Sequence, residues 1–215
     1  MCGRYTLSTK DYGKHYGVEQ EAFEFSSYNI APTQTIPMVL EQGGERVVSA
    51  AQWGMLPSWV KDRQAFKAST FNARSENAAE KASFKKPLRY QRAIVPASGF
   101  YEWSHQSGET KTPHYIQLSG GEPIGFAGLY DVWRDEVLSC TILTTTPNEL
   151  MATLHDRMPV ILSPEDYDTW LDPGITDPEE VQSLMRPYPG EMQAYPVSRA
   201  VNSPKNNTAA LLEPV

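Results

Sequence analysis

The residue with the most distinctive chemistry in this 215-residue chain is a cysteine at the second position. Removal of Met1 would make Cys2 the amino terminus, where a thiol and an α-amine lie on adjacent carbons. Their reference pKa values, about 8.5 and about 7.7, leave a deprotonated fraction of each near neutral pH. Such an aminothiol can condense with an aldehyde and close to a thiazolidine, or the thiolate can attack a carbonyl while the amine acts as base. Position alone is equally compatible with Cys2 lying in an inert N-terminal tail.

Two further residues have the chemistry to move protons. Glu102 lies in segment 98–103, whose aromatic side chains would desolvate its carboxyl group and raise its pKa towards the range of a general acid. His155 follows a predicted helix and precedes Asp156 and Arg157. A single histidine is more often structural than catalytic, so its spacing alone does not assign it a role.

Three other segments carry polar or aromatic side chains outside the predicted core. Segment 71–76 combines an amide in Asn72, a guanidinium in Arg74 and a carboxylate in Glu76 at a predicted loop-to-helix junction. Segment 28–33 is a predicted polar loop interrupted by Pro32, and segment 53–59 is a predicted turn with a tryptophan at each end. Taken singly, the loop and the turn indicate packing more often than function.

The charge of the chain is unevenly distributed. A net charge of -7 argues against a general nucleic-acid-binding protein. However, nine cations and only three acids lie between Lys61 and Arg92, whereas Arg157 and Arg186 are the only cations from Asp135 to Glu191. This asymmetry predicts one positive face, typical of a polyanion site, although a solvated run of charge would give the same pattern.

The composition is typical of a globular protein with one substantial core, since 40% of the residues are hydrophobic. No segment resembles a signal peptide or a membrane span, so we expect a cytoplasmic protein. With Cys2 and Cys140 as the only cysteines, neither a disulfide framework nor a zinc site is predicted. Cys140 lies in an apolar predicted strand, where we expect a buried, inert thiol.

Short predicted strands dominate the chain. They cover residues 36–40, 46–53, 92–96, 115–118, 124–133, 137–145, 159–162 and 192–197. Helices are predicted to begin after Thr146, Ser163 and Asp177, because each of these capping residues is followed by proline and then by an acid in the first turn. We therefore expect one α+β domain over residues 1–215, built on a mainly antiparallel, barrel-like sheet with a few peripheral helices.

Taken in order, several motifs closely resemble those of the SOS-response-associated peptidase (SRAP) family, and the resemblance runs along nearly the whole chain. The motifs are Cys2-Gly-Arg-Tyr, Asn29-Ile-Ala-Pro, Trp53-Gly-Met-Leu-Pro, Asn72-Ala-Arg-Ser-Glu, Gly99-Phe-Tyr-Glu-Trp, His155-Asp-Arg-Met-Pro and Val197-Ser-Arg-Ala-Val-Asn.

The resemblance implies a protein that binds single-stranded DNA and attaches covalently to abasic sites. In this family the N-terminal cysteine forms a thiazolidine with the lesion and shields it during the DNA damage response. The family name reflects an inferred peptidase activity that removes Met1 or a short leader. By this resemblance we expect an enzyme with no metal or organic cofactor and no membrane partner, and we expect it to be monomeric.

The resemblance also implies roles for individual residues. Cys2 would be the nucleophile, and Asn72 would hold the opened sugar and the cysteine amine. Glu102 would shuttle protons during ring opening and thiazolidine closure, while His155 would assist proton transfer in forming and reversing the imine. An abasic sugar rests mainly as a closed hemiacetal, so proton transfer must open it before the amine can attack.

A second group of residues resembles the family's DNA contacts. Arg4, Arg74 and Arg157 would bind phosphates, with Lys205 and Asn206 beside them. Pro32 and Trp59 would stack on the bases that flank the lesion and separate the strands. Some relatives carry two adjacent tryptophans where this chain has Trp59 and Val60, which predicts a smaller aromatic platform.

Two alternatives remain open at this point. Class II glutamine amidotransferases also begin Met-Cys-Gly, but they need an Asn-Gly oxyanion element and a second domain, and this chain has no Asn-Gly dipeptide. The other alternative is a non-covalent reader of single strands or modified bases, in which Cys2 is incidental. Such a reader would not need Glu102 and His155 near the amino terminus.

Overall fold

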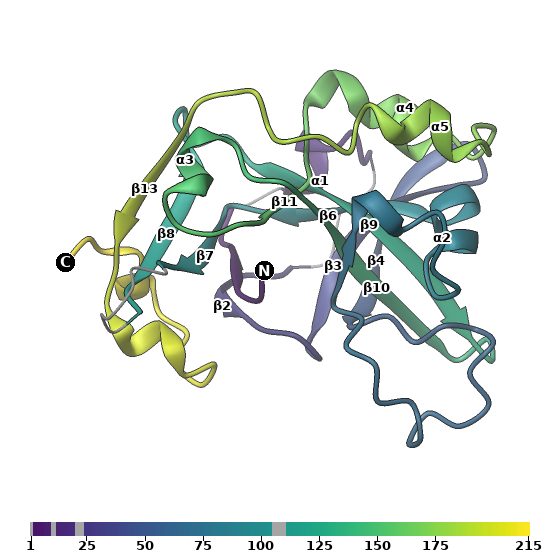
Figure 1. Ribbon diagram of the computed structural model, residues 1–215, viewed down its shortest axis with the longest axis horizontal. Coiled ribbons are helices and arrows are strands. Elements are labelled where there is room, and N and C mark those ends of the chain that lie inside the picture. Colours follow the sequence, from purple (N-terminus) through teal and green to yellow (C-terminus); the bar gives the residue numbers. More distant parts are fainter. Residues whose placement is uncertain (1, 10–11, 20–23, 105–110) are drawn as a thin grey trace.

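Most of the strands belong to a sheet that closes on itself. The computed structural model describes residues 2–9, 12–19, 24–104 and 111–215. In the larger sheet, β4 (Glu45–Trp53), β3 (Thr35–Gln42), β6 (Arg92–Ala97) and β9 (Ile124–Trp133) follow β10 (Val137–Thr145), and β9 pairs again with β10. These strands therefore form a closed barrel, which confirms the barrel-like sheet predicted from the sequence (Figure 1).

Short strands extend the barrel sheet. Strand β11 (Met158–Pro159) pairs with β10, and β12 (Ile161–Leu162) pairs with β9. Strand β5 (Asn72–Arg74) pairs with β10 in parallel, as does β4, whereas the other pairings of this sheet are antiparallel. The sheet is thus mainly antiparallel, as predicted.

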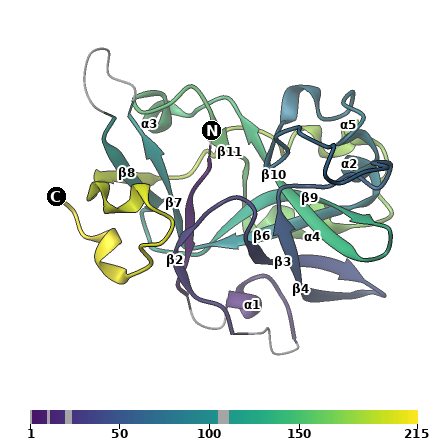
Figure 2. The same cartoon turned by 90° about the horizontal axis from the view of Figure 1, so that it is seen from below.

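A second, antiparallel sheet carries the amino terminus. Its order is β13 (Met192–Pro196), β8 (Pro113–Leu118), β7 (Gly99–Trp103), β1 (Tyr5–Leu7) and β2 (Ser27–Ile30). Only Ser98 separates β6 of the barrel from β7, so the chain passes directly from one sheet into the other. Figures 1 and 2 show the N-terminus between this sheet and the barrel strands.

The core of the molecule anchors β1. The ring of Tyr5 packs edge-on against Trp53 and Phe126, with centroid distances of 5.3 and 5.8 Å. Thr6 is also buried and its hydroxyl contacts that of Tyr115 at 3.0 Å. Because both faces of β1 are held by buried contacts, the residues just before it have a fixed position.

The helices are short and peripheral. They are α1 (Tyr12–His15), α2 (Lys85–Tyr90), α3 (Glu149–Ala152), α4 (Tyr167–Leu171) and α5 (Pro178–Gln182), with 3-10 turns η1 (Ser75–Asn77), η2 (Pro164–Asp166), η3 (Arg199–Asn202) and η4 (Ala209–Leu212). No helix in the described part of the chain is both long and apolar enough to cross a membrane.

The structure corrects several local predictions. Strands β1, β2, β5 and β7 were not predicted, and part of the expected loop at 28–33 belongs to β2. The first predicted helix begins after Asn148, not Thr146, because the Asn148 side chain accepts a hydrogen bond from the Met151 N–H. The Asp177 cap is confirmed, since its side chain accepts from the Glu179 N–H.

Candidate functional site

Cys2 is buried three residues before β1, next to the strand that carries Glu102. Strands β1 and β7 pair with Tyr5 opposite Phe100, and the Tyr101 N–H donates to the Arg4 carbonyl at 2.9 Å. Continued by two residues, this antiparallel register places Gly3 opposite Glu102. The fold therefore brings together two residues that are far apart in sequence and that both have the chemistry of a reactive site.

Asn72 reaches Cys2 from the barrel. Its side-chain amide donates a 2.8 Å hydrogen bond to the Cys2 carbonyl oxygen. Strand β5 holds Asn72 in place by pairing in parallel with β10, where Asn72 lies opposite Ile142 and Arg74 opposite Thr144. Alternate residues of a strand share a face, so Arg74 lies on the same face as Asn72, and its side chain is exposed.

Burial controls the acid–base chemistry of Cys2 and Glu102. The pKa of the Cys2 thiol is raised to about 12, mainly by burial and also by the Glu102 carboxylate, because a negative charge opposes formation of the thiolate. Burial also raises the pKa of Glu102, and the nearby Asp156 carboxylate acts in the same direction. Glu102 is only 4% exposed. Both groups therefore retain their protons to higher pH than they would in water.

His155 lies in the loop between α3 and β11, beside Asp156. Its Nδ1 atom is 2.8 Å from Asp156 Oδ1 and 3.0 Å from the backbone N of Arg157. A protonated Nδ1 donates to Asp156, whereas an unprotonated Nδ1 accepts from the Arg157 N–H, so one protonation state cannot make both bonds. The loop thus offers a partner for Nδ1 in either state. The Asp156 carboxylate also acts to raise the pKa of Glu102, which links this loop electrostatically to the Glu102 carboxyl group.

Arg157 is buried in an ion pair, not exposed as Arg74 is. Its guanidinium donates to both carboxylate oxygens of Glu76, at 2.6 and 2.8 Å, and to the Thr144 carbonyl at 2.7 Å. The hydrogen bond from Arg157 is the main reason that the pKa of Glu76 is lowered. Direct phosphate binding by Arg157, which the sequence suggested, would have to replace or share these contacts.

Arg4 and Asn29 hold the C-terminal segment against β2. Arg4 Nη1 donates to Asn29 Oδ1 at 2.9 Å and to the Val201 carbonyl at 2.7 Å. The buried Asn29 amide in turn donates to the Asn206 carbonyl at 2.7 Å. Lys205, the next residue back, is exposed. The structure therefore groups Arg4, Lys205 and Asn206, three of the predicted DNA contacts, around Asn29, a residue to which no role was assigned from sequence.

Pro32 and Trp59, the two residues expected to stack on bases and separate the strands, lie in separate turns. Pro32 is half-buried in the turn between β2 and β3, and Trp59 is 56% exposed in the segment between β4 and β5, where its ring packs edge-on against Phe66. Val60 points the other way, into a small apolar cluster with Leu56 and Trp133. Val60 therefore contributes to packing, and of the two adjacent residues only Trp59 offers an exposed aromatic ring.

Outside this site, Cys140 is buried in β10, and burial raises its pKa to about 12, in keeping with the predicted inert thiol. The described residues contain no group of three or more histidine, cysteine or acidic side chains placed to hold a metal ion.

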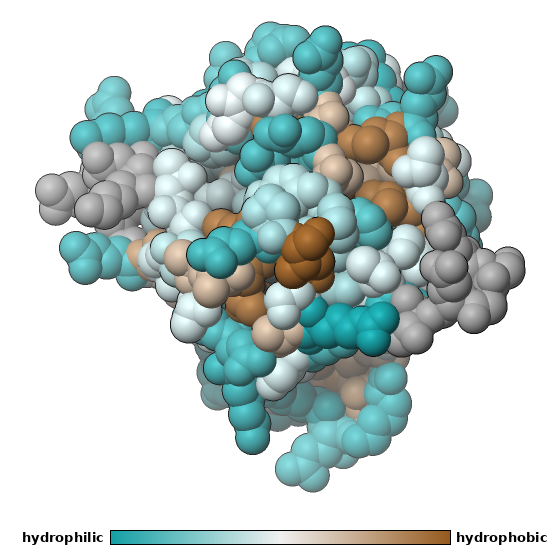
Figure 3. Space-filling view, turned by 90° about the vertical axis from the view of Figure 1, so that its left-hand side faces the viewer, coloured by the Kyte–Doolittle hydropathy of each residue, from teal (hydrophilic) through white to brown (hydrophobic). Residues whose placement is uncertain are grey.

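On the side of the molecule that carries β13 and the C-terminal segment, hydrophobic side chains form small separate spots among hydrophilic ones (Figure 3).

Comparison with known proteins identifies the class to which this fold and site belong. The model of the SOS response associated peptidase (SRAP) family matches residues 1–204, and the chain belongs to this family. It is 44% identical over 223 residues to the abasic site processing protein YoqW of Bacillus subtilis, covering 99% of both chains. It is 31% identical to the abasic site processing protein HMCES of Gallus gallus, covering 88% of this chain and 66% of that protein.

Solved structures show the same fold. A crystal structure of a protein from Bacteroides thetaiotaomicron superposes with a TM-score of 0.87 at 27% identity, and each chain is covered completely. A protein from Bordetella bronchiseptica gives a TM-score of 0.79 at 27% identity, covering 92% of this chain and all of the other.

Proposed function

We propose that this protein binds single-stranded DNA and forms a covalent thiazolidine between Cys2, once Met1 has been removed, and the aldehyde of an abasic site. The observation that carries the proposal is the hydrogen bond from the Asn72 amide to the Cys2 carbonyl, beside the buried Glu102. Family membership and the names of the abasic site processing relatives support the same substrate.

The proposed reaction begins with opening of the abasic sugar. The bond between C1′ and the ring oxygen breaks, the ring oxygen gains a proton and the C1′ hydroxyl loses one to water, which leaves an aldehyde. Glu102, whose pKa is raised by burial, is suited to supply the first proton. Asn72 then orients the aldehyde and the Cys2 amine without competing as a nucleophile.

The amine next attacks the aldehyde carbon, and loss of one water gives an imine. His155 assists this step by moving a proton to the departing hydroxyl. The Cys2 sulfur then bonds to the imine carbon, and the thiol proton ends on the imine nitrogen. Because burial of Cys2 raises the pKa of its thiol, little thiolate is present at neutral pH, so the thiol must lose its proton as the ring closes. The Glu102 carboxylate formed in the first step is the base we propose.

The same site would act on the chain's own start. For removal of Met1 we propose that the Cys2 sulfur attacks the Met1 carbonyl carbon, the C–N bond between Met1 and Cys2 breaks, and the thiol proton passes through Glu102 to the freed nitrogen. Water then hydrolyses the resulting thioester, which releases methionine and restores the thiol. The enzyme would work without a metal or organic cofactor, as a cytoplasmic monomer.

Arg74 would contact a phosphate, and Pro32 and Trp59 would stack on flanking bases and exclude a continuous complementary strand.

The alternatives receive less support. A glutamine amidotransferase shares only the first residues and does not account for a family match over residues 1–204. A non-covalent reader would bind DNA without needing Asn72 on the Cys2 carbonyl or Glu102 beside Cys2.

Incubation of the protein with a single-stranded oligonucleotide that contains one abasic site tests the proposal. We expect a product that survives heating and denaturing electrophoresis, because a thiazolidine lacks the easily hydrolysed imine. Cys2→Ala should lose this product while still binding the undamaged strand. Equal yields of heat-stable product from wild type and Cys2→Ala would show that the aminothiol is not the reacting group.

A further inference from the structure

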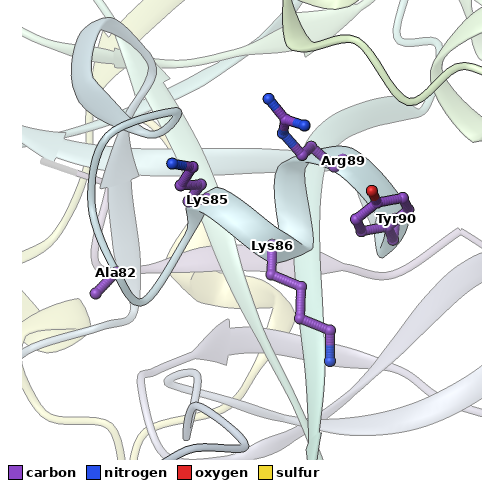
Figure 4. A pocket seen from close by; sticks show the side chains of 5 residues that line it. All are labelled: Ala82, Lys85, Lys86, Arg89 and Tyr90. Atoms are coloured by element: carbon purple, nitrogen blue, oxygen red, sulfur yellow. The ribbon is translucent and has the colours of Figure 1, made fainter.

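The described residues contain a cationic surface on helix α2 and just before it. Lys81, Lys85 and Lys86 are exposed, and Arg89 is half-buried beside them. None of these four cations forms an ion pair within the described residues. With Ala82 and Tyr90, the last three line a shallow pocket of about 340 Å³ (Figure 4). We call Lys81, Lys85, Lys86, Arg89 and Tyr90 the α2 surface.

The placement of these charges opposes folding. Lys85 and Arg89 lie four positions apart in the helix, so their like charges are on the same face and repel. The first turn of α2 contains Lys85 and Lys86 but no acid, and no side chain caps the helix. A chain with net charge -7 has many acids that could neutralise such a cluster, yet none is paired with it in the described part of the structure. An anionic ligand would remove this repulsion.

The aromatic member of the surface narrows the choice of ligand. Tyr90 is 54% exposed, which is unusual for a large aromatic side chain, and it adjoins the cations at the end of the helix. A positive surface with an exposed aromatic ring suits single-stranded nucleic acid, because the cations bind the phosphates while an unpaired base stacks on the ring. A duplex offers phosphates but no free base face.

Helix α2 follows strand β5 of the candidate site in the chain. The chain leads from Asn72 and Arg74 in β5 through η1 to α2 without leaving the region of positive charge. Figures 1 and 2 both place α2 well to one side of the N-terminus. A DNA strand with a phosphate bound by Arg74 would therefore reach α2 only by continuing from the Cys2 site in one of its two directions.

We propose that the α2 surface is a second DNA contact, which binds the single-stranded continuation of the strand on one side of the Cys2 site. The inference rests on the proposed DNA-binding function and adds to it a binding surface on one side of the Cys2 site. It assigns phosphate binding to Lys85, Lys86 and Arg89, and base stacking to Tyr90.

The test measures binding of undamaged oligonucleotides that span only the Cys2 site or are extended at the 5′ or the 3′ end. Wild type should gain affinity from extension at one end. Lys85→Ala/Lys86→Ala should lose most of that gain, about threefold to tenfold, with a salt slope smaller by roughly 0.7 for each phosphate that is no longer bound. Lys14→Glu, on α1, shifts the net charge equally and should keep the gain.

Tyr90→Leu separates stacking from charge. It should lower the affinity for the single-stranded extension but not for the same extension hybridised to a complement. Crosslinking of the short abasic oligonucleotide should be unchanged in all these variants, so a failure of Cys2 chemistry would be seen separately from a failure of the α2 surface. Wild-type affinity of Lys85→Ala/Lys86→Ala for every length, or an equal loss with Lys14→Glu, would overturn the proposal.

Discussion

The side-chain amide of Asn72 donates a hydrogen bond of 2.8 Å to the backbone carbonyl of Cys2. This bond joins the barrel to the N-terminal strand at the residue that would react. It fixes the direction of the Cys2 main chain, and hence of the groups attached to its α-carbon. Asn72 is therefore placed to position Cys2, the nucleophile that we propose, before any substrate binds.

Replacement of this amide should slow crosslinking. Asn72→Asp keeps the shape of the side chain but replaces the N–H donor by an oxygen that faces the Cys2 carbonyl, so we expect the single-turnover rate to fall tenfold or more, corresponding to about 1.4 kcal/mol or more. Asn72→Ala should also react slowly but bind undamaged single strands with near wild-type affinity. Wild-type rates in both variants would show that Asn72 does not position Cys2.

Glu102 should make both activity and stability depend on pH. Its pKa is raised by burial, so its contribution to stability is fully present below the ordinary carboxyl value and is lost as the pH rises through the raised value. Glu102→Gln cannot ionise. Its melting temperature should fall less than that of wild type over this pH range, and its crosslinking rate should be lower and lack the corresponding pH limb. Parallel melting profiles would mean that ionisation of Glu102 does not destabilise the fold.

Arg74 should contribute salt-dependent DNA binding. It is exposed on the face of β5 that also carries Asn72. Arg74→Glu should weaken binding to undamaged single strands and reduce the salt slope by about 0.7 or more, whereas Lys14→Glu, with the same change in charge, should have a much smaller effect. Equal effects of the two substitutions would indicate general electrostatics, not a contact at Arg74.

The ion pair between Arg157 and Glu76 should stabilise the fold near the site. Because the pKa of Glu76 is lowered, this stabilisation is present above the ordinary carboxyl value and is lost as the pH falls through the lowered value. We expect Glu76→Gln to reduce the free energy of unfolding by about 1–2 kcal/mol at neutral pH, since Glu76 is partly exposed, and by less in acid. Denaturant unfolding of both proteins at two pH values measures the difference, and a pH-independent difference would contradict this account.

The long strands could be predicted from sequence because their signal is local. Strands β9 and β10 are long segments rich in apolar and β-branched residues between turns, and their bounds match the prediction. Strand β5 was interpreted as a loop-to-helix junction because it has three residues and depends on parallel pairing with β10, far away in the chain. Nothing in the local sequence indicates such a partner.

The same distinction applies to the site. The segments that contain Cys2, Asn72 and Glu102 were identified from their residue types and their resemblance to the family, and the structure brings these three residues together. The burial of Arg157 was not foreseen, because its partner Glu76 lies 81 residues away. The role of Asn29 in holding the C-terminal segment was missed for the same reason, since its partners are distant in sequence.

Intact-mass and peptide-mass spectrometry of the protein after reaction with an abasic single-stranded oligonucleotide tests the central claim most directly. We predict an adduct on the peptide that begins with Cys2, with the mass of protein without Met1 plus DNA minus one water. Its sulfur should resist alkylation and its mass should not change with borohydride, whereas an imine would be reduced. A chain with an uncleavable extension before Cys2 should bind DNA but give no such adduct. A stable adduct at another residue, or one formed equally by the extended chain, would contradict the account.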